Sequence, residues 1–238
     1  MIQSFQAPGR ELPFVLLNVA VSADGKIATA NRLVHSFGSA RDLEHLYELR
    51  ATADAIMCGA RTLEISGATL GNGGDKFRKL RLRNGLSEHP LRIVVSGSGS
   101  IDPGAKIFQK RFSSIILLTT QRASPRRLSR LRTLAQAVQI SDQHEIDFVS
   151  VFRWLYQQWK VRRLLCEGGG ELNDALFRAG LVDEIHMTFC PMLFGGRRAP
   201  TLADGLGCLR LAAAADFKLS SIRRKNDELF TVFSRRNQ

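Results

Sequence analysis

Short runs of apolar residues recur along the chain, and most of them end at glycine, serine or another small polar residue. The first run, FVLLNVAV at 14–21, is interrupted only by Asn18, a pattern typical of a strand buried on both faces of a parallel sheet. Further runs of this kind predict strands at 55–58, 91–95, 115–119, 137–140, 161–166 and 184–189. Two later apolar stretches, at 217–222 and 229–233, predict a closing antiparallel pair.

Segments with apolar residues at helical spacing alternate with these strands. Ser39 and Asp42 resemble a capping box with Asp in place of Glu, and leucines at helical spacing follow them. Helices are also predicted over 125–135 and 149–159. The pattern is lost in the Gly-rich, basic segment 64–90, which is either a long loop near a site or a partly helical insertion.

The segment VRRLLCEGGGELNDALFRA at 161–179 places three adjacent glycines between a strand and a helix. Backbone N–H groups at such a helix N-terminus can face an anion such as a diphosphate, because glycine has no Cβ and the helix dipole favours negative charge. A tight turn that needs glycine only for steric reasons is the alternative. Similar junctions stand at 22–26 (SADGK), 59–62 (GART) and 96–100 (SGSGS), so an extended ligand such as a dinucleotide would fit the sheet edge.

The alternation of strands and helices predicts one α/β domain over residues 1–238, with a mainly parallel sheet and a flexible arm at 1–12. No apolar run is long enough to span a bilayer, and the N-terminus lacks the pattern of a signal peptide, so we expect a cytoplasmic protein that does not use a membrane. The four cysteines are far apart and lack metal-ligand spacing, so we expect reduced thiols and no metal.

The chain carries a formal net charge of +12, concentrated in the segments 76–83, 122–132 and 223–225. Such segments can bind nucleic acid. However, Phe77 is the only aromatic residue among them, and no nucleic-acid motif accompanies them, so a solvated basic surface that attracts anionic metabolites is favoured. Fingerprints of Rossmann dinucleotide binding, Walker A, GxSxG and HExxH are absent, which excludes the common readings of those motifs.

Four segments together resemble one enzyme family. They are VAVSADGKIA at 19–28, LRATADAIMCGARTL at 49–63, CEGGGELNDALFRAGLVDEI at 166–185 and PMLFGG at 191–196. In this order they are similar to the pyrimidine reductases of riboflavin biosynthesis, which include the reductase half of the bifunctional deaminase-reductase. The resemblance implies a three-layer fold like that of dihydrofolate reductase. It also implies a hydride transfer from NADPH to C1 of a ribosyl group that is opened to an imine-like form on a phosphorylated aminopyrimidine, which gives a ribityl chain.

The same resemblance implies roles for individual residues. Lys26 and Asp24 would border the reacting end, with Lys26 the better candidate for charge stabilisation or proton relay. Glu167, Arg50 and Leu70 would face the substrate. Ser96 and Ser98 fall where the ribose 2′-phosphate is received, and Arg61 would add charge there. The cofactor contacts implied are Val21, Ser36, Gly59, Arg61, Thr62, Ser66, Ser96, Ser98, Gly168, Gly169, Gly170, Glu171, Leu172 and Asn173.

Several residues depart from the family pattern, mostly in the substrate half. An Asp-Asp-Pro step of the family is replaced by Ser66, Gly67 and Ala68, and an expected Arg three positions after Leu70 is Gly73. The helix position often held by His is Tyr47, and Ala60 replaces the second glycine of GxGT. No HxE with PCxxC signature occurs in the chain, so the zinc deaminase partner domain is not part of it.

Alternatives stay open at this point. Asp24 can simply cap its turn, and Arg50 can pair with Glu48 or Asp54. The main functional alternative is a non-catalytic nucleotide or nucleic-acid binding protein that retains the fold, motivated by the altered segment at 65–68 and the basic segments. The family resemblance further implies a homodimer, although the pattern of apolar and polar residues does not by itself predict an oligomeric state.

Overall fold

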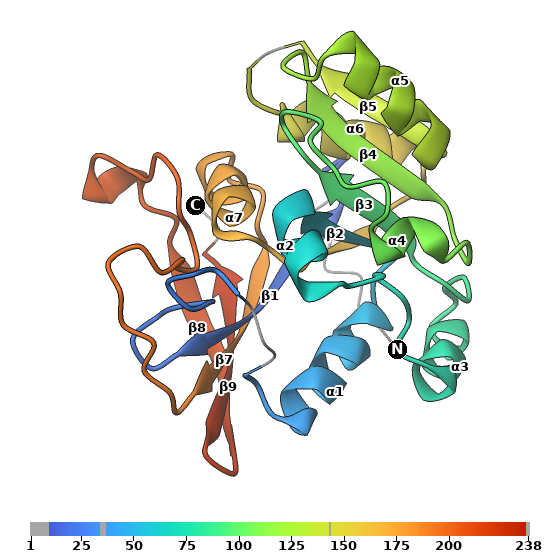
Figure 1. The fold of residues 1–238 in the computed structure, drawn as a ribbon. Coiled ribbons are helices and arrows are strands. Elements are labelled where there is room, and N and C mark those ends of the chain that lie inside the picture. Colours follow the sequence, from blue (N-terminus) through green and yellow to red (C-terminus); the bar gives the residue numbers. More distant parts are fainter. Residues whose placement is uncertain (1–9, 34–36, 143, 237–238) are drawn as a thin grey trace. The chain divides into compact units, whose positions relative to one another are not determined.

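Nine strands form a mainly parallel sheet in the computed structural model, which describes residues 10–33, 37–142 and 144–236 (Figure 1). The chain divides into two compact units. The first comprises Met1–Phe14 and Tyr47–Leu165, and the second comprises Val15–Leu46 and Cys166–Gln238. The expected arm at 1–12 lies outside the described residues except for its last three positions.

The first unit contains a parallel array of strands. Their order is β5 (Ala137–Ser141), β4 (Ile115–Thr120), β3 (Leu91–Val95), β2 (Ala55–Gly59) and β6 (Arg163–Cys166), and the pairs β2–β3, β3–β4 and β4–β5 are parallel. The helices of this unit are α2 (Ala60–Ser66), α3 (Asp75–Arg83), α4 (Lys106–Gln109), α5 (Pro125–Leu134) and α6 (Phe148–Gln158).

Both faces of these strands are buried. On one face, Cys58, Val94 and Leu117 pack in a cluster with residues of α2, α4 and α5. The residues that alternate with them, such as Ile93 and Ile116, are also fully buried, and α6 contributes its own buried apolar side chains. Successive side chains of a strand point to opposite faces, so the continuous apolar runs require helices on both sides. The predicted three-layer α/β class is confirmed.

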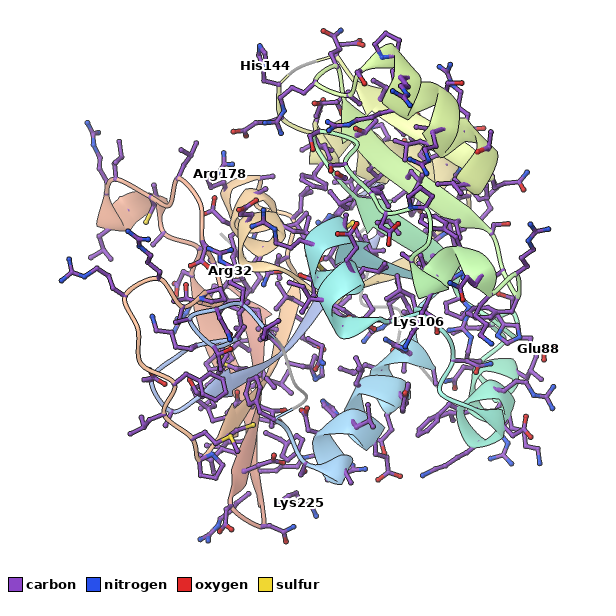
Figure 2. The ribbon with its side chains drawn as sticks, in the orientation of Figure 1. Arg32, Glu88, Lys106, His144, Arg178 and Lys225 are labelled. Carbon is purple, nitrogen blue, oxygen red and sulfur yellow. The ribbon has the colours of Figure 1, made fainter. Side chains whose placement is uncertain are left out.

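The second unit combines parallel and antiparallel pairs. Its strand order is β1 (Phe14–Ser22), β7 (Glu184–Cys190), β9 (Glu228–Arg235) and β8 (Phe217–Lys225). β1 and β7 are parallel, whereas β9 is antiparallel to both β7 and β8, as predicted for the closing pair. Lys225 stands at the tip of this hairpin (Figure 2). The unit also holds the start of α1 (Ala40–Arg50), α7 (Gly170–Arg178) and the short 3-10 helix η1 (Leu211–Ala213).

The start of α1 corrects one local prediction. The Ser39 hydroxyl accepts hydrogen bonds from the first-turn N–H groups of Arg41 and Asp42, so Ser39 caps the helix. The reciprocal bond to the Ser39 N–H comes from Glu228 of β9, at 2.7 Å, and not from Asp42. An Asp side chain is one methylene shorter than the Glu of a capping box. Asp42 is instead directed into the unit, where burial raises the pKa of its carboxyl.

The segment 64–90 contains the end of α2 and the nine residues of α3, and a buried arginine anchors α3. Arg81 of α3 has no exposed surface. Its guanidinium donates to the carbonyl oxygens of Arg50 at 2.5 Å, Ala53 at 2.7 Å and Ser87 at 2.9 Å. These acceptors include carbonyl groups at the C-terminal end of α1, which have no partner within the helix. Burial lowers the pKa of Arg81 to about 10, so it is still charged at neutral pH.

Replacing this guanidinium tests its structural role. We expect Arg81→Met to lower the free energy of unfolding by about 3 kcal/mol, because the carbonyl groups that it binds would stay buried without donors. Arg83→Met is the matched control, since Arg83 lies exposed on the same helix. Urea unfolding of the two variants provides the measurement, and equal midpoints for both would contradict the assigned role.

Candidate active site

The predicted cofactor residues of the first unit gather at one edge of its parallel strands. Gly59 ends β2 and is paired with Val95 at the end of β3, so the GART junction and the turn Ser96–Ser100 follow neighbouring strand ends. Gly59 is the N-cap of α2 and provides no side-chain cap. Arg61 is exposed and Thr62 is half-buried in the first turn of that helix. Gly59 therefore offers no side-chain acceptor to the first N–H groups of α2.

The turn Ser96–Ser100 is held by the end of β4. The Thr120 hydroxyl donates to the Gly97 carbonyl oxygen at 2.7 Å, and the Ser96 N–H donates to Leu118 at 2.9 Å. Within the turn, the Gly99 N–H donates to the Ser96 carbonyl oxygen at 3.0 Å. The turn is therefore a fixed feature of the first unit and is half-buried over Ser96, Gly97 and Ser98.

Ser66 has a local role in the same unit. Its hydroxyl donates to the Leu63 carbonyl oxygen at 3.4 Å and accepts from the Ala68 N–H at 3.3 Å. It therefore helps to end α2, where Gly67 has the left-handed conformation expected after a helix. Contact with a cofactor stays a prediction for this residue.

The substrate candidates of the first unit are largely enclosed. Arg50 is 7% exposed, its guanidinium donates to the Gly71 carbonyl oxygen at 2.8 Å, and it lies 5.3 Å from the centre of the Tyr47 ring. Leu70 has no exposed surface and belongs to the core of the unit. Its φ of 54° lies in the left-handed region, which is uncommon for a branched side chain. Leu70 thus shapes the loop, and contact with substrate stays a prediction.

Tyr47 and Gly73, two of the departures from the family pattern, lie against each other and depend on each other's size. Gly73 has a φ of 86°, and a Cβ at this position would collide with the ring of Tyr47. The Tyr47 ring packs in turn against Phe77, with 5.3 Å between the ring centres. A larger residue at 73 therefore requires a smaller residue, or a different rotamer, at 47. The sequence alone could not show this coupling, because 26 positions separate the two residues.

In the second unit, Asp24 joins two segments that follow parallel strands. Its carboxylate accepts from the Ser22 hydroxyl at 2.6 Å and from the N–H groups of Phe194 and Gly195 at 3.1 and 2.8 Å. These hydrogen bonds, led by that of Ser22, lower the pKa of Asp24 to about 2. Asp24 is thus an ionised carboxylate that ties the SADGK turn to the segment PMLFGG, and it is a poor proton donor.

Lys26 is held in place through its backbone. Its N–H donates to the Ser22 hydroxyl at 2.9 Å, and it forms an isolated antiparallel bridge with Thr201. Among the described residues, no hydrogen bond or ion pair engages its ammonium group, and the residue is half-buried. A fixed backbone with an available cation suits a group that acts on a bound substrate.

The glycine segment after β6 forms the expected turn into α7. Gly168 and Gly169 have φ values of 81° and 110°, which only glycine adopts readily, and Gly169 begins α7 without a side-chain cap. A Cβ at 168 would lie 3.3 Å from the side-chain amide of Asn173. Asn173 is fully buried and its amide donates to the Leu202 carbonyl oxygen at 2.8 Å, so its side chain fixes the turn.

The neighbours of this turn differ in exposure. Glu167 is half-buried, Glu171 is exposed, and the side chains of Val21 and Leu172 are buried, with 2% and 7% of their surface exposed.

Full burial raises the pKa of the Cys166 thiol to about 12, so this cysteine is a core residue and not a nucleophile. Ser36 lies outside the described residues. At the far end of α7, Arg178 pairs with Asp174 at 2.9 Å (Figure 2).

The sequence does not show which groups bind the candidate residues. The motif PMLFGG is recognisable, but not the hydrogen bonds that its Phe194 and Gly195 N–H groups donate to Asp24. Nor does the sequence show that Thr120 binds the serine turn. Among the described residues, no group of three His, Cys, Asp or Glu side chains is suited to a metal ion, and no helix is both long and apolar enough to cross a membrane.

Comparisons with known proteins identify the family. The model of the RibD C-terminal domain matches residues 13–229. A 2,5-diamino-6-ribosylamino-4(3H)-pyrimidinone 5′-phosphate reductase from Methanothermobacter thermautotrophicus is 31% identical over 222 residues, which cover 93% of this chain and 98% of the relative. A protein of the same name from Aquifex aeolicus is 27% identical over 225 residues, with coverages of 93% and 96%.

Other relatives are longer or are known as structures. The riboflavin biosynthesis protein RibD of Chlamydia trachomatis is 26% identical, and the match covers 94% of this chain but 57% of that protein. A pyrimidine reductase-like protein from Corynebacterium diphtheriae has the same fold, with a TM-score of 0.81 at 19% identity and coverages of 95% and 93%. Because the family model matches nearly the whole length of the sequence, the chain belongs to the RibD C-terminal domain family.

Proposed function

We propose that this protein is an NADPH-dependent reductase of riboflavin biosynthesis, whose substrate is a ribosylaminopyrimidine 5′-phosphate. One observation carries the proposal: a relative with this reductase activity in its name is 31% identical and is matched over 98% of its length. The reaction reduces the ribosyl group to a ribityl chain. We further propose that the protein acts in the cytoplasm.

The reaction constrains what the residues must do. When bound, NADPH supplies a hydride to C1 of the opened ribosyl group, and one proton is taken up as the carbon–nitrogen double bond becomes an amine. The chain must therefore hold that carbon in position, exclude competing water and support delivery of the proton that the nitrogen takes up. No nucleophile is needed, which agrees with the buried, protonated state of Cys166.

Lys26 supplies the charge in this proposal. Its ammonium is available among the described residues, whereas the Asp24 carboxylate is engaged in three hydrogen bonds. Asp24 is then a positioning residue that holds the turn bearing Lys26. Glu167 and Arg50 are proposed to face the substrate, as their places in the family motifs imply.

Two glycine features fit a nicotinamide dinucleotide. The start of α7 has no side-chain cap, and its glycines at 168 and 169 allow a close backbone approach, which suits a diphosphate. The start of α2 at Gly59 likewise lacks a cap. The turn Ser96–Ser100 is proposed to receive the 2′-phosphate that distinguishes NADPH from NADH.

A homodimer is also part of the proposal. β8 is the last strand in the sheet order, and its side chains Leu219 and Ile222 are 54% and 57% exposed. An exposed edge strand with apolar side chains is a ready surface for pairing. A non-catalytic nucleic-acid binding protein is not favoured, because the model of the RibD C-terminal domain matches residues 13–229 and a relative matched over 98% of its length is named as a reductase.

The proposed activity is tested with the named substrate. Purified protein should oxidise NADPH only when 2,5-diamino-6-ribosylamino-4(3H)-pyrimidinone 5′-phosphate is present, with a much lower kcat/KM for NADH. The product should contain a ribityl chain by mass spectrometry. Binding of NADPH without any turnover of this substrate would contradict the substrate assignment, and binding of neither dinucleotide would contradict the reductase itself.

A second expectation concerns Lys26. Lys26→Met should lower kcat about a hundredfold or more, because a positioned acid or cation contributes at least that much to such steps, while the Kd for NADPH stays the same. Lys218→Met is the control, since Lys218 is exposed on β8. A wild-type kcat in Lys26→Met would remove Lys26 from the chemistry.

The pH profile separates Asp24 from Lys26. The pKa of Asp24 in the folded protein is about 2, below its ordinary 3.8, so its hydrogen-bonded state is complete above the ordinary value and is lost only as pH falls through about 2. Between about pH 4 and about pH 9, Asp24→Asn should therefore lower kcat/KM by a constant factor and keep the shape of the profile. Loss of the alkaline limb in this variant would identify Asp24 as a proton donor instead.

A further inference from the structure

The basic segment 122–132 has no role in the function proposed so far. It holds five arginines, all of them exposed: Arg122, Arg126, Arg127, Arg130 and Arg132. Among the described residues, none of them forms an ion pair with a carboxylate. Like charges gathered on one short helix repel one another, and such a group attracts anions.

This segment begins directly beside the turn Ser96–Ser100. A Cβ on Gly99, whose φ is 65°, would lie 2.7 Å from the Cβ of Ala123, so the turn and the segment are in contact. The contact is rigid, because Thr120 is fully buried and donates through both its hydroxyl and its N–H to Gly97. Arg127 adds a bond from its guanidinium to the Ser98 carbonyl oxygen at 3.2 Å.

These contacts engage the carbonyl acceptors of Gly97 and Ser98 but not the backbone donors of the same two residues. The carbonyl oxygens of Gly97 and Ser98 are bound by Thr120 and Arg127. Among the described residues, the N–H groups of Gly97 and Ser98 donate to no acceptor, and the Ser98 hydroxyl only accepts, from the Ser100 N–H at 3.4 Å. Two backbone donors and one hydroxyl donor on a fixed turn suit the oxygen atoms of a phosphate.

Arg122 places a positive charge on this turn. A Cβ on Gly97 would collide with Nη2 of Arg122, so the guanidinium lies against the backbone of Gly97. Among the described residues, this guanidinium makes no hydrogen bond. A planar guanidinium beside free N–H and O–H donors matches a phosphate monoester, which carries about −1.5 to −2 charges at neutral pH.

We propose that Arg122 selects NADPH over NADH by binding the 2′-phosphate on the turn Ser96–Ser100. The inference rests on the proposed function and deepens it by naming the specificity-determining residue. NADH has a neutral hydroxyl at the same position, so the contribution of Arg122 is present only with NADPH. Arg127 donates to the Ser98 carbonyl oxygen, so this acceptor of the turn is already bound.

The test measures binding by calorimetry and requires no turnover. The probes are adenosine 2′,5′-bisphosphate, 5′-AMP, NADPH and NADH. Arg122→Ala should weaken the binding of adenosine 2′,5′-bisphosphate and NADPH roughly ten- to a hundredfold, as expected for the loss of charged hydrogen bonds, and leave 5′-AMP and NADH unchanged. Arg132→Ala is the matched control and should change none of the four, because Arg132 lies in the last turn of α5 whereas Arg122 precedes this helix.

A second variant tests the position of the charge without removing it. Gly97→Ala keeps the N–H group and has no backbone strain, because the φ of Gly97 is not in the left-handed region. Its methyl group must displace the Arg122 guanidinium, so we expect a loss of affinity for adenosine 2′,5′-bisphosphate in the same direction as in Arg122→Ala. The double variant should then lose little more than either single variant.

The outcomes separate the inference from the function on which it rests. If both dinucleotides bind and Arg122→Ala leaves their affinity ratio unchanged, the inference is overturned and the reductase stands. If neither dinucleotide binds to the wild-type protein, the proposed function fails. If single-stranded RNA binds, and Arg122→Ala and Arg132→Ala weaken it equally with a strong salt dependence, the segment is a nucleic-acid surface and the inference is overturned.

Discussion

Burial of parallel strands on both faces is the constraint on which the molecule depends. In the first unit, Cys58, Val94 and Leu117 fill one side of the strands, and the residues between them fill the other. Such strands have no exposed face on which polar side chains can stand. Polar and charged groups that can meet a ligand therefore stand where the strands end, and the ends of β2, β3 and β4 lead into GART, the serine turn and Arg122.

Parallel strand direction also brings two loops together in the second unit. β1 and β7 are parallel, so the SADGK turn and the segment PMLFGG leave the same edge and come within hydrogen-bond distance of each other. The Asp24 carboxylate makes that connection together with the Ala23 N–H, which donates to the Met192 carbonyl oxygen at 2.8 Å, and the hydrogen bonds on Asp24 keep it ionised. The roles proposed for Asp24, which holds the turn, and for Lys26, which supplies the cation, are consistent with this strand direction and with the hydrogen bonds on the Asp24 carboxylate.

Sequence reasoning predicted those parts that depend on local periodicity. The strand at 91–95 was placed with its observed bounds, and the others differ by a few residues, because apolar runs record burial directly. It failed where distant residues decide the local structure. Arg81 orders the segment 64–90 by binding carbonyl groups of residues 50 and 53, and Glu228 takes the part assigned to Asp42 at the start of α1. Neither partner is near its target in sequence.

The candidate site shows the same limit. Motifs identified its glycines, Lys26 and the serine turn, but not what lies against them. The contacts of Tyr47 with Gly73 and of Arg122 with Gly97 join residues about 25 positions apart and became visible only in the folded chain.

The central claim, that the protein transfers hydride from NADPH to a ribosyl carbon, is tested most directly with NADPH deuterated at C4 of its dihydronicotinamide ring. With cofactor labelled on the transferred face, the account predicts one deuterium at C1 of the ribityl product. A reduced product without deuterium, from cofactor labelled on either face, would contradict it.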